Sequence, residues 1–280
     1  MDYVARAPDP PLAALIDDVY LLSGTPRHRR LNVPPMPSAH LFLNLGEPVR
    51  LYDSDPGVPA ATLTDAWFLG LSTRRFIIEY PTSVRLAGVH FKPWGLAPFV
   101  DVSLSDLRDQ WVPADAVWGP AVHRLRDQIA QAPSPWTALQ VVEDELRARR
   151  VPEPPRHFDL VNHTAGRLES SWGSVGVRAL TDSAGVSATH LASQFKGLVG
   201  ITPKRLARIY RFARLILSVD AAAPVDWSGL AQTAGYFDQA HLGKEFKDFT
   251  GLTPTGYLAL RRRLPAAPGF PPDLGPMPAD

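Results

Sequence analysis

The feature of this 280-residue sequence that most constrains its fold is a doubled motif near the C-terminal end. The pattern Phe-Lys-x-x-x-Gly-x-Thr-Pro begins at Phe195 and returns at Phe246, an offset of 51 residues. Further positions repeat at an offset of 50 or 51 residues, namely Leu180/Leu230, Ala184/Ala234, Gly185/Gly235, His190/His241 and Leu191/Leu242. So many matches over a short span predict two copies of one supersecondary unit.

Each copy is typical of a short helix, a glycine turn and a second, capped helix. The first helices are predicted at 178–184 and 228–234, each followed by a glycine that can adopt the left-handed conformation. Ser187 and Asp238 are suited to cap the second helices, because their side-chain oxygens accept hydrogen bonds from free amides. Each second helix buries a leucine and a phenylalanine four residues apart, and a Thr-Pro pair begins the next helix. This is the helix-turn-helix layout, in which the second helix enters the major groove of DNA.

An amphipathic helix over 204–219 is predicted to join the two units. Its sixteen residues span about 24 Å at ~1.5 Å per residue. That length suits two recognition helices held near the ~34 Å spacing of successive major-groove faces. The helix also carries positive charge along or beside its apolar face, from Arg205, Arg208, Arg211 and Arg214.

These residues resemble the AraC/XylS family of bacterial transcription regulators over about residues 173–263. The matching segments are Ala184-Gly185-Val186-Ser187, His190-Leu191, Phe195-Lys196, Gly200-Ile201-Thr202-Pro203-Lys204, Ala234-Gly235-Tyr236-Phe237-Asp238-Gln239, His241-Leu242, Lys244, Phe246-Lys247 and Gly251-Leu252-Thr253-Pro254. The segment 88–95, with the helices that follow it, is similar to the sensor half of an AraC-type subgroup. The resemblance implies a DNA-binding regulator with an N-terminal sensor.

The resemblance also implies which side chains meet DNA. They are Thr189, His190, Ala192, Ser193, Gln194 and Lys196 in the first unit, Arg208 and Arg211 in the joining helix, and Gln239, Ala240, Gly243, Lys244 and Lys247 in the second unit. Gln239 is suited to adenine and Lys244 to guanine or a phosphate. The family commonly has arginine where this chain has Ser193, and Gly243 also departs from the pattern. The first helix is therefore expected to position the protein through phosphates and groove shape.

Some of these residues have a second interpretation. His190 and His241 follow the same pattern beside buried leucines, and packing or phosphate contact is favoured over base reading for both. Lys196 and Lys247 fit a phosphate contact and a plain solvated lysine equally well. The charge distribution favours the DNA-binding interpretation. Residues 1–155 carry 15 basic and 18 acidic side chains, whereas residues 156–264 carry 14 and 8, a net charge of +6 that suits a polyanion.

The N-terminal half has a different pattern. Short apolar and β-branched stretches at 41–45, 49–52, 66–71, 75–80 and 84–92, separated by turn formers, predict antiparallel strands of a barrel or sandwich. Helical periodicity follows at 122–130 and 136–149. The predicted fold class is α+β, with a small β-barrel or cupin-like sheet and helices, followed by an all-α double helix-turn-helix domain.

Three prolines among residues 152–155 predict a stiff linker. We therefore expect an effector-sensing or dimerisation domain at 1–151 and the DNA-binding domain at 156–264. Residues 265–280 contain six prolines and are expected to be disordered.

A search for enzyme chemistry gives nothing that points to catalysis. His28, His40 and His90 lack the paired spacing of a metal-binding barrel, and Asp17-Asp18 and Glu143-Asp144-Glu145 fit solvated helix faces. No catalytic residue, metal or cofactor is predicted. Aromatic strand residues fit either plain core or an effector pocket, the pocket candidates being Phe42, Tyr52, Trp67, Phe91 and Trp94, with Phe68 and Phe76 nearby in the pattern.

The predicted function is sequence-specific regulation of transcription, controlled by a small-molecule effector in the N-terminal domain. Expected partners are operator DNA, the effector, a second copy of the chain and, for an activator, RNA polymerase. No apolar run reaches the ~18–20 residues of a membrane span, there is no signal-peptide pattern and there is no cysteine, so a cytoplasmic location is expected. The alternatives are a barrel enzyme of small-molecule metabolism with a helical appendage and a module whose helical half binds protein.

Overall fold

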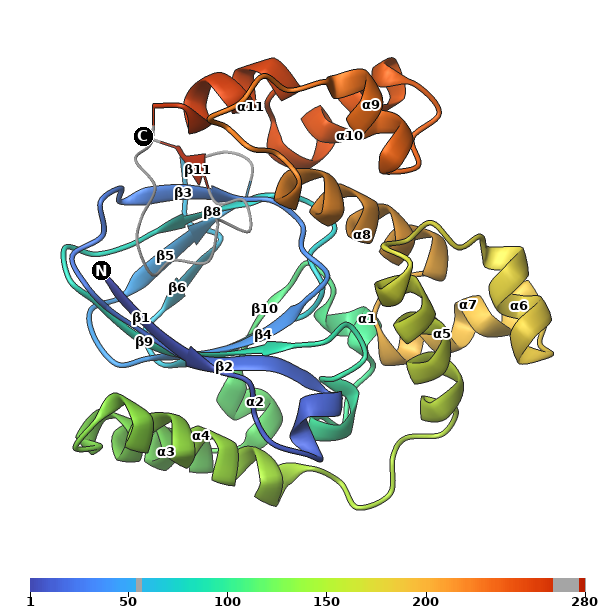
Figure 1. The fold of residues 1–280 in the computed structure, drawn as a ribbon. Helices are drawn as coiled ribbons and strands as arrows, with labels where there is room; N and C mark the ends of the chain where they lie inside the picture. Colours follow the sequence, from blue (N-terminus) through green and yellow to red (C-terminus); the bar gives the residue numbers. More distant parts are fainter. Residues whose placement is uncertain (54–56, 264–276, 280) are drawn as a thin grey trace.

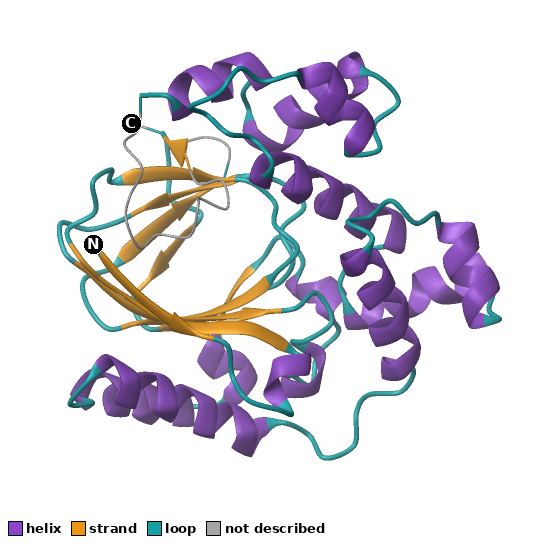
Figure 2. Ribbon diagram, in the orientation of Figure 1, coloured by secondary structure: helices purple, strands orange, loops and turns teal. Residues whose placement is uncertain are grey.

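A computed structural model describes residues 1–53, 57–263 and 277–279 of the chain. Two antiparallel sheets face each other in the N-terminal half, and helices make up nearly all of the C-terminal half (Figure 2). The first sheet has the strand order β1 (Asp2–Arg6), β2 (Ile16–Gly24), β9 (Val84–Phe91), β4 (Ala39–Asn44), β7 (Ala66–Leu69), β10 (Trp111–Pro113). The second has the order β11 (Met277–Pro278), β3 (Arg30–Val33), β8 (Phe76–Glu79), β5 (Val49–Tyr52), β6 (Ala61–Leu63).

The two sheets enclose a set of buried side chains, here called the inner cluster. It consists of Tyr20, Leu22, Phe42, Val49, Leu51, Leu63, Leu69, Phe76, Ile78, Val84 and Leu86. Side chains of a strand alternate between its faces, so Phe42 points inward while Leu41 and Leu43 point to the helices outside. A Cβ on Gly88 would lie 2.2 Å from Cζ of Tyr20, so only glycine lets that ring lie flat on β9. The predicted antiparallel α+β class is confirmed.

Helices cover the outer face of the first sheet (Figure 1). They are α2 (Ala114–Trp118), α3 (Ala121–Gln131) and α4 (Pro135–Arg149), preceded by the short α1 (Leu104–Leu107) and by 3-10 turns at Leu12–Ala14 and Ala97–Phe99. The apolar residues that produce the helical periodicity of these two segments are buried: Leu125, Ile129, Leu139, Val142 and Leu146. Both helix predictions are confirmed to within a residue or two.

The C-terminal half contains α5 (Phe158–Ser170), α6 (Val177–Ala184), α7 (Ala188–Leu198), α8 (Pro203–Leu217), α9 (Trp227–Thr233), α10 (Gln239–Thr250) and α11 (Pro254–Arg261). We call α6–α7 the first unit and α9–α10 the second unit. The predicted caps are confirmed: Ser187 accepts from the His190 amide and Asp238 from the His241 amide. Gly185 ends α6 at φ 64°, the left-handed conformation that glycine adopts without strain.

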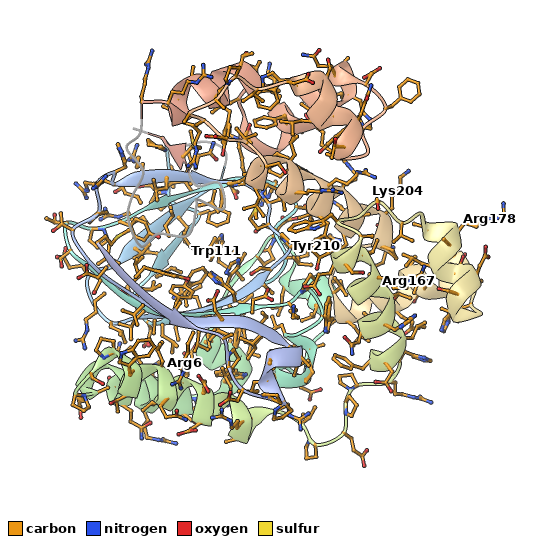
Figure 3. The ribbon with its side chains drawn as sticks, in the orientation of Figure 1. Arg6, Trp111, Arg167, Arg178, Lys204 and Tyr210 are labelled. Atoms are coloured by element: carbon orange, nitrogen blue, oxygen red, sulfur yellow. The ribbon has the colours of Figure 1, made fainter. Side chains whose placement is uncertain are left out.

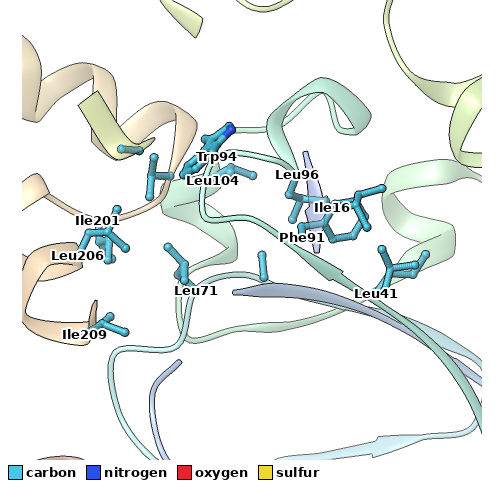
Figure 4. Packing of buried hydrophobic residues seen from close by; sticks show 14 of the residues in the cluster. Ile16, Leu41, Leu71, Phe91, Trp94, Leu96, Leu104, Ile201, Leu206 and Ile209 are labelled. Atoms are coloured by element: carbon cyan, nitrogen blue, oxygen red, sulfur yellow. The ribbon is translucent and has the colours of Figure 1, made fainter. Parts of the chain in front are cut away.

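The two halves of the chain share one core. A continuous cluster of buried side chains, here called the shared core, includes residues from the outer face of the first sheet, from α3 and α4 and from both units. Figure 4 shows Leu71, Trp94 and Leu104 of the N-terminal half beside the apolar residues Ile201, Leu206 and Ile209. Helix α8 and the turn before it are therefore packed directly on the N-terminal half, and α7 of the first unit packs on α1.

A glycine marks the tightest approach between the halves. Gly200, at φ 86°, follows the end of α7, and a Cβ there would lie 2.6 Å from the Leu104 carbonyl oxygen. Val151, in the connection that contains the prolines, donates its amide to the Pro98 carbonyl at 3.0 Å. The predicted linker is thus irregular chain without helix or strand, but apolar packing continues past it.

Several predictions from the sequence are wrong. Asp17 and Asp18 lie in strand β2, which was not predicted, and a register shift between Ile16 and Asp18 obscures its alternation. Glu143 is not solvated but buried, because it pairs with Arg6 and Arg147. Strands β1, β3, β6 and β10 were also missed.

The predicted disordered tail is wrong in its last part. Met277 and Pro278 form β11 on the edge of β3, while residues 264–276 and 280 lie outside the described residues. In the described part of the chain, no helix is long and apolar enough to cross a membrane.

Candidate nucleic-acid interface

Helix α7 turns one apolar face inward and a small, polar face outward. Leu191 and Phe195 are fully buried. The predicted DNA-facing residues on the other side are exposed at Thr189, Ser193 and Lys196 and half-buried at His190, Ala192 and Gln194. His190 makes an edge-to-face contact with His157, with ring centroids 5.2 Å apart, which agrees with the packing interpretation of this residue. The free face of α7 thus carries a single cation and short side chains.

Helix α10 exposes a larger polar face. Gln239, Ala240, His241, Lys244 and Lys247 are exposed and Gly243 is half-buried, while Leu242 and Phe246 lie in the shared core. Oε1 of the Gln239 side-chain amide accepts a hydrogen bond from the Ser228 hydroxyl at 3.3 Å, so α9 orients this side chain. A Cβ on Gly243 would meet nothing within 4 Å. This face has amide and ammonium donors on both sides of Gly243. Because Gly243 has no side chain, a DNA groove can come close to the backbone there.

Arg208 does not belong to this free surface. Its Nε donates to Oε2 of Glu245 at 2.6 Å, and the Glu245 side chain is only 2% exposed. The guanidinium also lies over the Phe249 ring, 5.5 Å from its centroid. In this arrangement the charge of Arg208 helps to fix α10 on α8, and its predicted DNA contact stays a prediction.

Arg211 is held in the same interface. Its guanidinium lies 5.9 Å from the centroid of the Tyr236 ring, and Tyr236 donates its hydroxyl to Oε1 of Glu245 at 3.0 Å. Burial and the nearby Glu245 carboxylate raise the pKa of Tyr236 far above its ordinary value, so the hydroxyl stays a donor. Arg208 and Arg211 thus stabilise the second unit from behind its recognition helix.

Three further exposed side chains lie outside the predicted set. Figure 3 shows Arg178 projecting from the start of α6, and its side chain is 92% exposed. Lys204 is exposed in the first turn of α8. Phe237, in the turn before α10, is 89% exposed. The sequence could have indicated these residues by position, because Arg178 and Lys204 lie at the start of a predicted helix and Phe237 lies in the glycine turn.

The predicted pocket residues do not line one cavity. Phe42 and Trp67 pack on the inner cluster, but Phe91 and Trp94 lie in the shared core on the other side of the first sheet. Tyr52 points to the far side of the second sheet, where its hydroxyl donates to Glu79 at 3.2 Å. The prediction that these five residues line one pocket is wrong. Successive side chains of a strand point to opposite faces of the sheet, so these aromatic residues face different sides.

A polar group lies among the inward-facing residues instead. His40 and His90 are cross-strand partners on β4 and β9, with ring centroids 5.0 Å apart. His90 is 2.9 Å from an Asp18 carboxylate oxygen and stacks on Tyr20. Nδ1 of His40 is buried and, among the described residues, has no hydrogen-bond partner. Burial and the charge of His90 hold the pKa of His40 well below its ordinary value.

A separate cleft of about 200 Å³ lies between β7 and the helices α2 and α3. Trp67, Asp65 and His123 contribute to its lining. His123 Nδ1 is 2.7 Å from an Asp65 oxygen, so this carboxylate already has a partner. Among residues 1–53, 57–263 and 277–279, no group of three or more His, Cys, Asp or Glu side chains is arranged to hold a metal ion.

Comparison with known families divides the chain into two matched segments. Residues 5–113 match a family described as a domain of unknown function (DUF6597). Residues 180–260 match a family described as a helix-turn-helix domain. The C-terminal segment is an AraC-type helix-turn-helix domain. The AraC-type domain makes the chain a DNA-binding transcription regulator, as predicted from the doubled motif.

Solved structures of one bacterial regulator are similar to the chain as a whole. ToxT from Vibrio cholerae matches with 9% identity over 92% of this chain and 98% of that one, at a TM-score of 0.47. ToxT with a bound unsaturated fatty acid matches with 12% identity over 86% of this chain and 94% of that one, at a TM-score of 0.44. No curated protein matches the chain.

Proposed function

We propose that the AraC-type domain reads one operator with its two units in different ways. The second unit reads bases through Gln239 and Lys244, and the first unit positions the protein through phosphates and groove shape. The contrast between the exposed faces of α7 and α10 carries this proposal. The first presents Thr189, Ser193 and Lys196, whereas the second presents a long amide and two ammonium groups.

Binding to the upstream intergenic region, titrated across salt, tests the proposal. Gln239→Ala is expected to cost about 1–3 kcal/mol of discrimination between operator and random DNA. Lys244→Ala is expected to lower the salt slope by about one if it meets a phosphate, and to relax base preference if it meets guanine. Gln110→Ala and Arg27→Ala, at exposed positions of the N-terminal half outside α3 and α4, are matched controls that should change neither quantity. Weak, sequence-indifferent binding that neither α10 variant alters would contradict the proposal.

We further propose that the N-terminal domain senses a small molecule between its two sheets. The buried Nδ1 of His40 supports this, because a buried polar atom without a partner is costly unless something satisfies it. Tyr20 and His90 stand beside it as further polar groups. Calorimetry and thermal shift with native metabolite pools identify the ligand, and its effect on operator affinity is then measured. If no ligand changes operator affinity, we would abandon the sensing role.

We also propose four further parts of the predicted function. Dimerisation is assigned to α3 and α4, where Trp136 is a large exposed apolar residue. Trp136→Ser should lower the mass measured by light scattering if a dimer forms there, and an unchanged mass would exclude this face. A non-catalytic role, a cytoplasmic location and contact with RNA polymerase by an activator complete the proposal.

A further inference from the structure

The last described residues of the chain return to the N-terminal half. Strand β11 pairs antiparallel with β3, with Met277 opposite Asn32 and Pro278 opposite Leu31. The Ala279 amide donates to the Arg30 carbonyl oxygen at 3.0 Å. The other neighbour of β3 is β8, so β11 covers what would otherwise be an edge of the second sheet. Unpaired strand edges readily accept an extended peptide.

The strand is seated by a buried side chain as well as by its backbone. Met277 is only 2% exposed, although it lies three residues from the end of the chain. It belongs to the shared core, together with Phe249, Tyr257 and Leu258 from α10 and α11. Burial of a methionine side chain is a substantial gain in free energy for a strand of this length. The buried Met277 side chain therefore helps to hold β11 on the edge of β3.

The second unit rests on the same edge of the sheet. Asn32, the residue opposite Met277, donates its amide to the carbonyl of Thr250 at 2.7 Å, at the end of α10. The Arg75 guanidinium lies close to Gly251, where an added Cβ would be 3.0 Å from its carbon. Figure 1 shows β11 beside β3, on the side that faces α11. Asn32 thus connects the C-terminal strand and the second recognition helix.

The first unit is attached differently. Helix α7 packs on α1, and the turn and α8 that follow it add the apolar residues Ile201 and Leu206 near Leu104 (Figure 4). Arg205 of α8 also donates a hydrogen bond to the Thr73 carbonyl at 3.4 Å. The second unit has the hydrogen bond from Asn32 and the close approach of Arg75 to Gly251 at this edge.

We propose that the edge of β3 is a peptide-binding site whose occupant is the chain's own C-terminal strand, residues 277–279. The seated strand straps the second unit to the N-terminal half and so limits the positions that α10 can take relative to α7. This inference does not depend on DNA binding, since it concerns contacts within the free protein.

Hydrogen exchange on the full-length protein tests the strap. Met277→Asp places a charge in a buried position, and a truncated chain that ends at residue 276 removes the strand altogether. Met277→Leu, which keeps an apolar side chain of similar size, is the matched control. We expect Met277→Asp and the truncation to accelerate exchange in α10 and α11 by roughly ten- to a hundredfold. Exchange in α6 and α7 should be unchanged, and Met277→Leu should behave like the natural chain.

Three results would overturn the proposal. If the Ala279 amide exchanges freely in the natural chain, the strand is not seated. If α10 and α11 exchange at the same rate in the truncated chain, the strand is seated but does not restrain the second unit. If light scattering finds a dimer that becomes a monomer on truncation, the occupant comes from a second copy of the chain. None of these measurements uses DNA, so failure of the strap is distinguishable from failure of the proposed function.

Discussion

Replacing Arg208 by alanine is expected to destabilise the second unit without removing a DNA contact. The Glu245 carboxylate, 2% exposed, receives hydrogen bonds from Arg208 at 2.6 Å and from Tyr236 at 3.0 Å. In the Arg208→Ala variant the carboxylate stays buried and keeps one of these two donors. Buried charges that lose their partner are among the most destabilising changes in a protein core.

The magnitude follows from the exposure of the two partners. Breaking a buried ion pair by removing one partner costs about 3–5 kcal/mol. The lower end applies, because the Arg208 side chain is itself 35% exposed and Tyr236 continues to donate. A cost of about 3 kcal/mol corresponds to roughly a hundredfold faster exchange of the α10 amides. Replacing both partners, as Arg208→Met with Glu245→Leu, should recover most of this loss.

Two assays separate the structural role from the DNA contact that the sequence predicted. Hydrogen exchange and urea unfolding report the stability of the second unit, and operator binding across salt reports phosphate contacts. The logarithmic salt slope falls by about 0.9 for each phosphate that the protein no longer neutralises, so it should be unchanged in Arg208→Ala measured where the variant is folded. If Arg208→Ala is as stable as the natural protein but has a lower salt slope, the reasoning is refuted and Arg208 contacts DNA as the sequence predicted.

Three further predictions concern the N-terminal half and its junction. Gly88→Ala should cost about 1–3 kcal/mol of stability in urea unfolding, because the new Cβ would lie 2.2 Å from the Tyr20 ring; an unchanged midpoint would mean that the ring has another place to lie. Gly200→Ala should loosen the end of α7, detected as faster hydrogen exchange there, because its Cβ would be 2.6 Å from the Leu104 carbonyl at φ 86°; unaltered exchange would show that the junction is not close-packed. Burial holds the pKa of His40 well below 6.5, so below pH 6.5 the unfolded chain binds a proton that the folded chain does not. Stability should therefore fall on acidification by up to about 1.4 kcal/mol per pH unit, and His40→Leu should flatten that part of the profile, whereas an equal slope in both proteins would assign it to other groups.

The parts of the fold that could be predicted from the sequence are those fixed by local chemistry. Ser187 and Asp238 cap their helices because each side chain reaches an amide three residues away. Leu191 and Phe195 are four residues apart and so share a helix face that must be buried. The doubled motif repeated these local signals, which is why both units were placed to within a residue or two.

The features that the sequence did not reveal depend on residues far apart in the chain. Arg208 has the pattern of a surface cation until Glu245, 37 residues later, folds against it. His40 and His90 are single histidines in the sequence, and only the register of β4 with β9 makes them neighbours. Proline in the last segment favours disorder by composition, yet Met277 finds a strand edge formed near the other end of the chain. In each case the deciding contact is tertiary.

The packing of Ile201 and Leu206 near Leu104 has a consequence for protein engineering. The proline-rich connection suggests that the C-terminal half could be cut off there and fused to the sensor domain of another protein. A fragment cut there would carry an uncovered apolar surface where the N-terminal half had been, and such surfaces promote aggregation. A workable chimera must therefore bring its own cover for these side chains, or retain the segment that contains Leu71 and Leu104. In this protein the point at which to join a chimera is therefore set by the hydrophobic packing and not by the prolines.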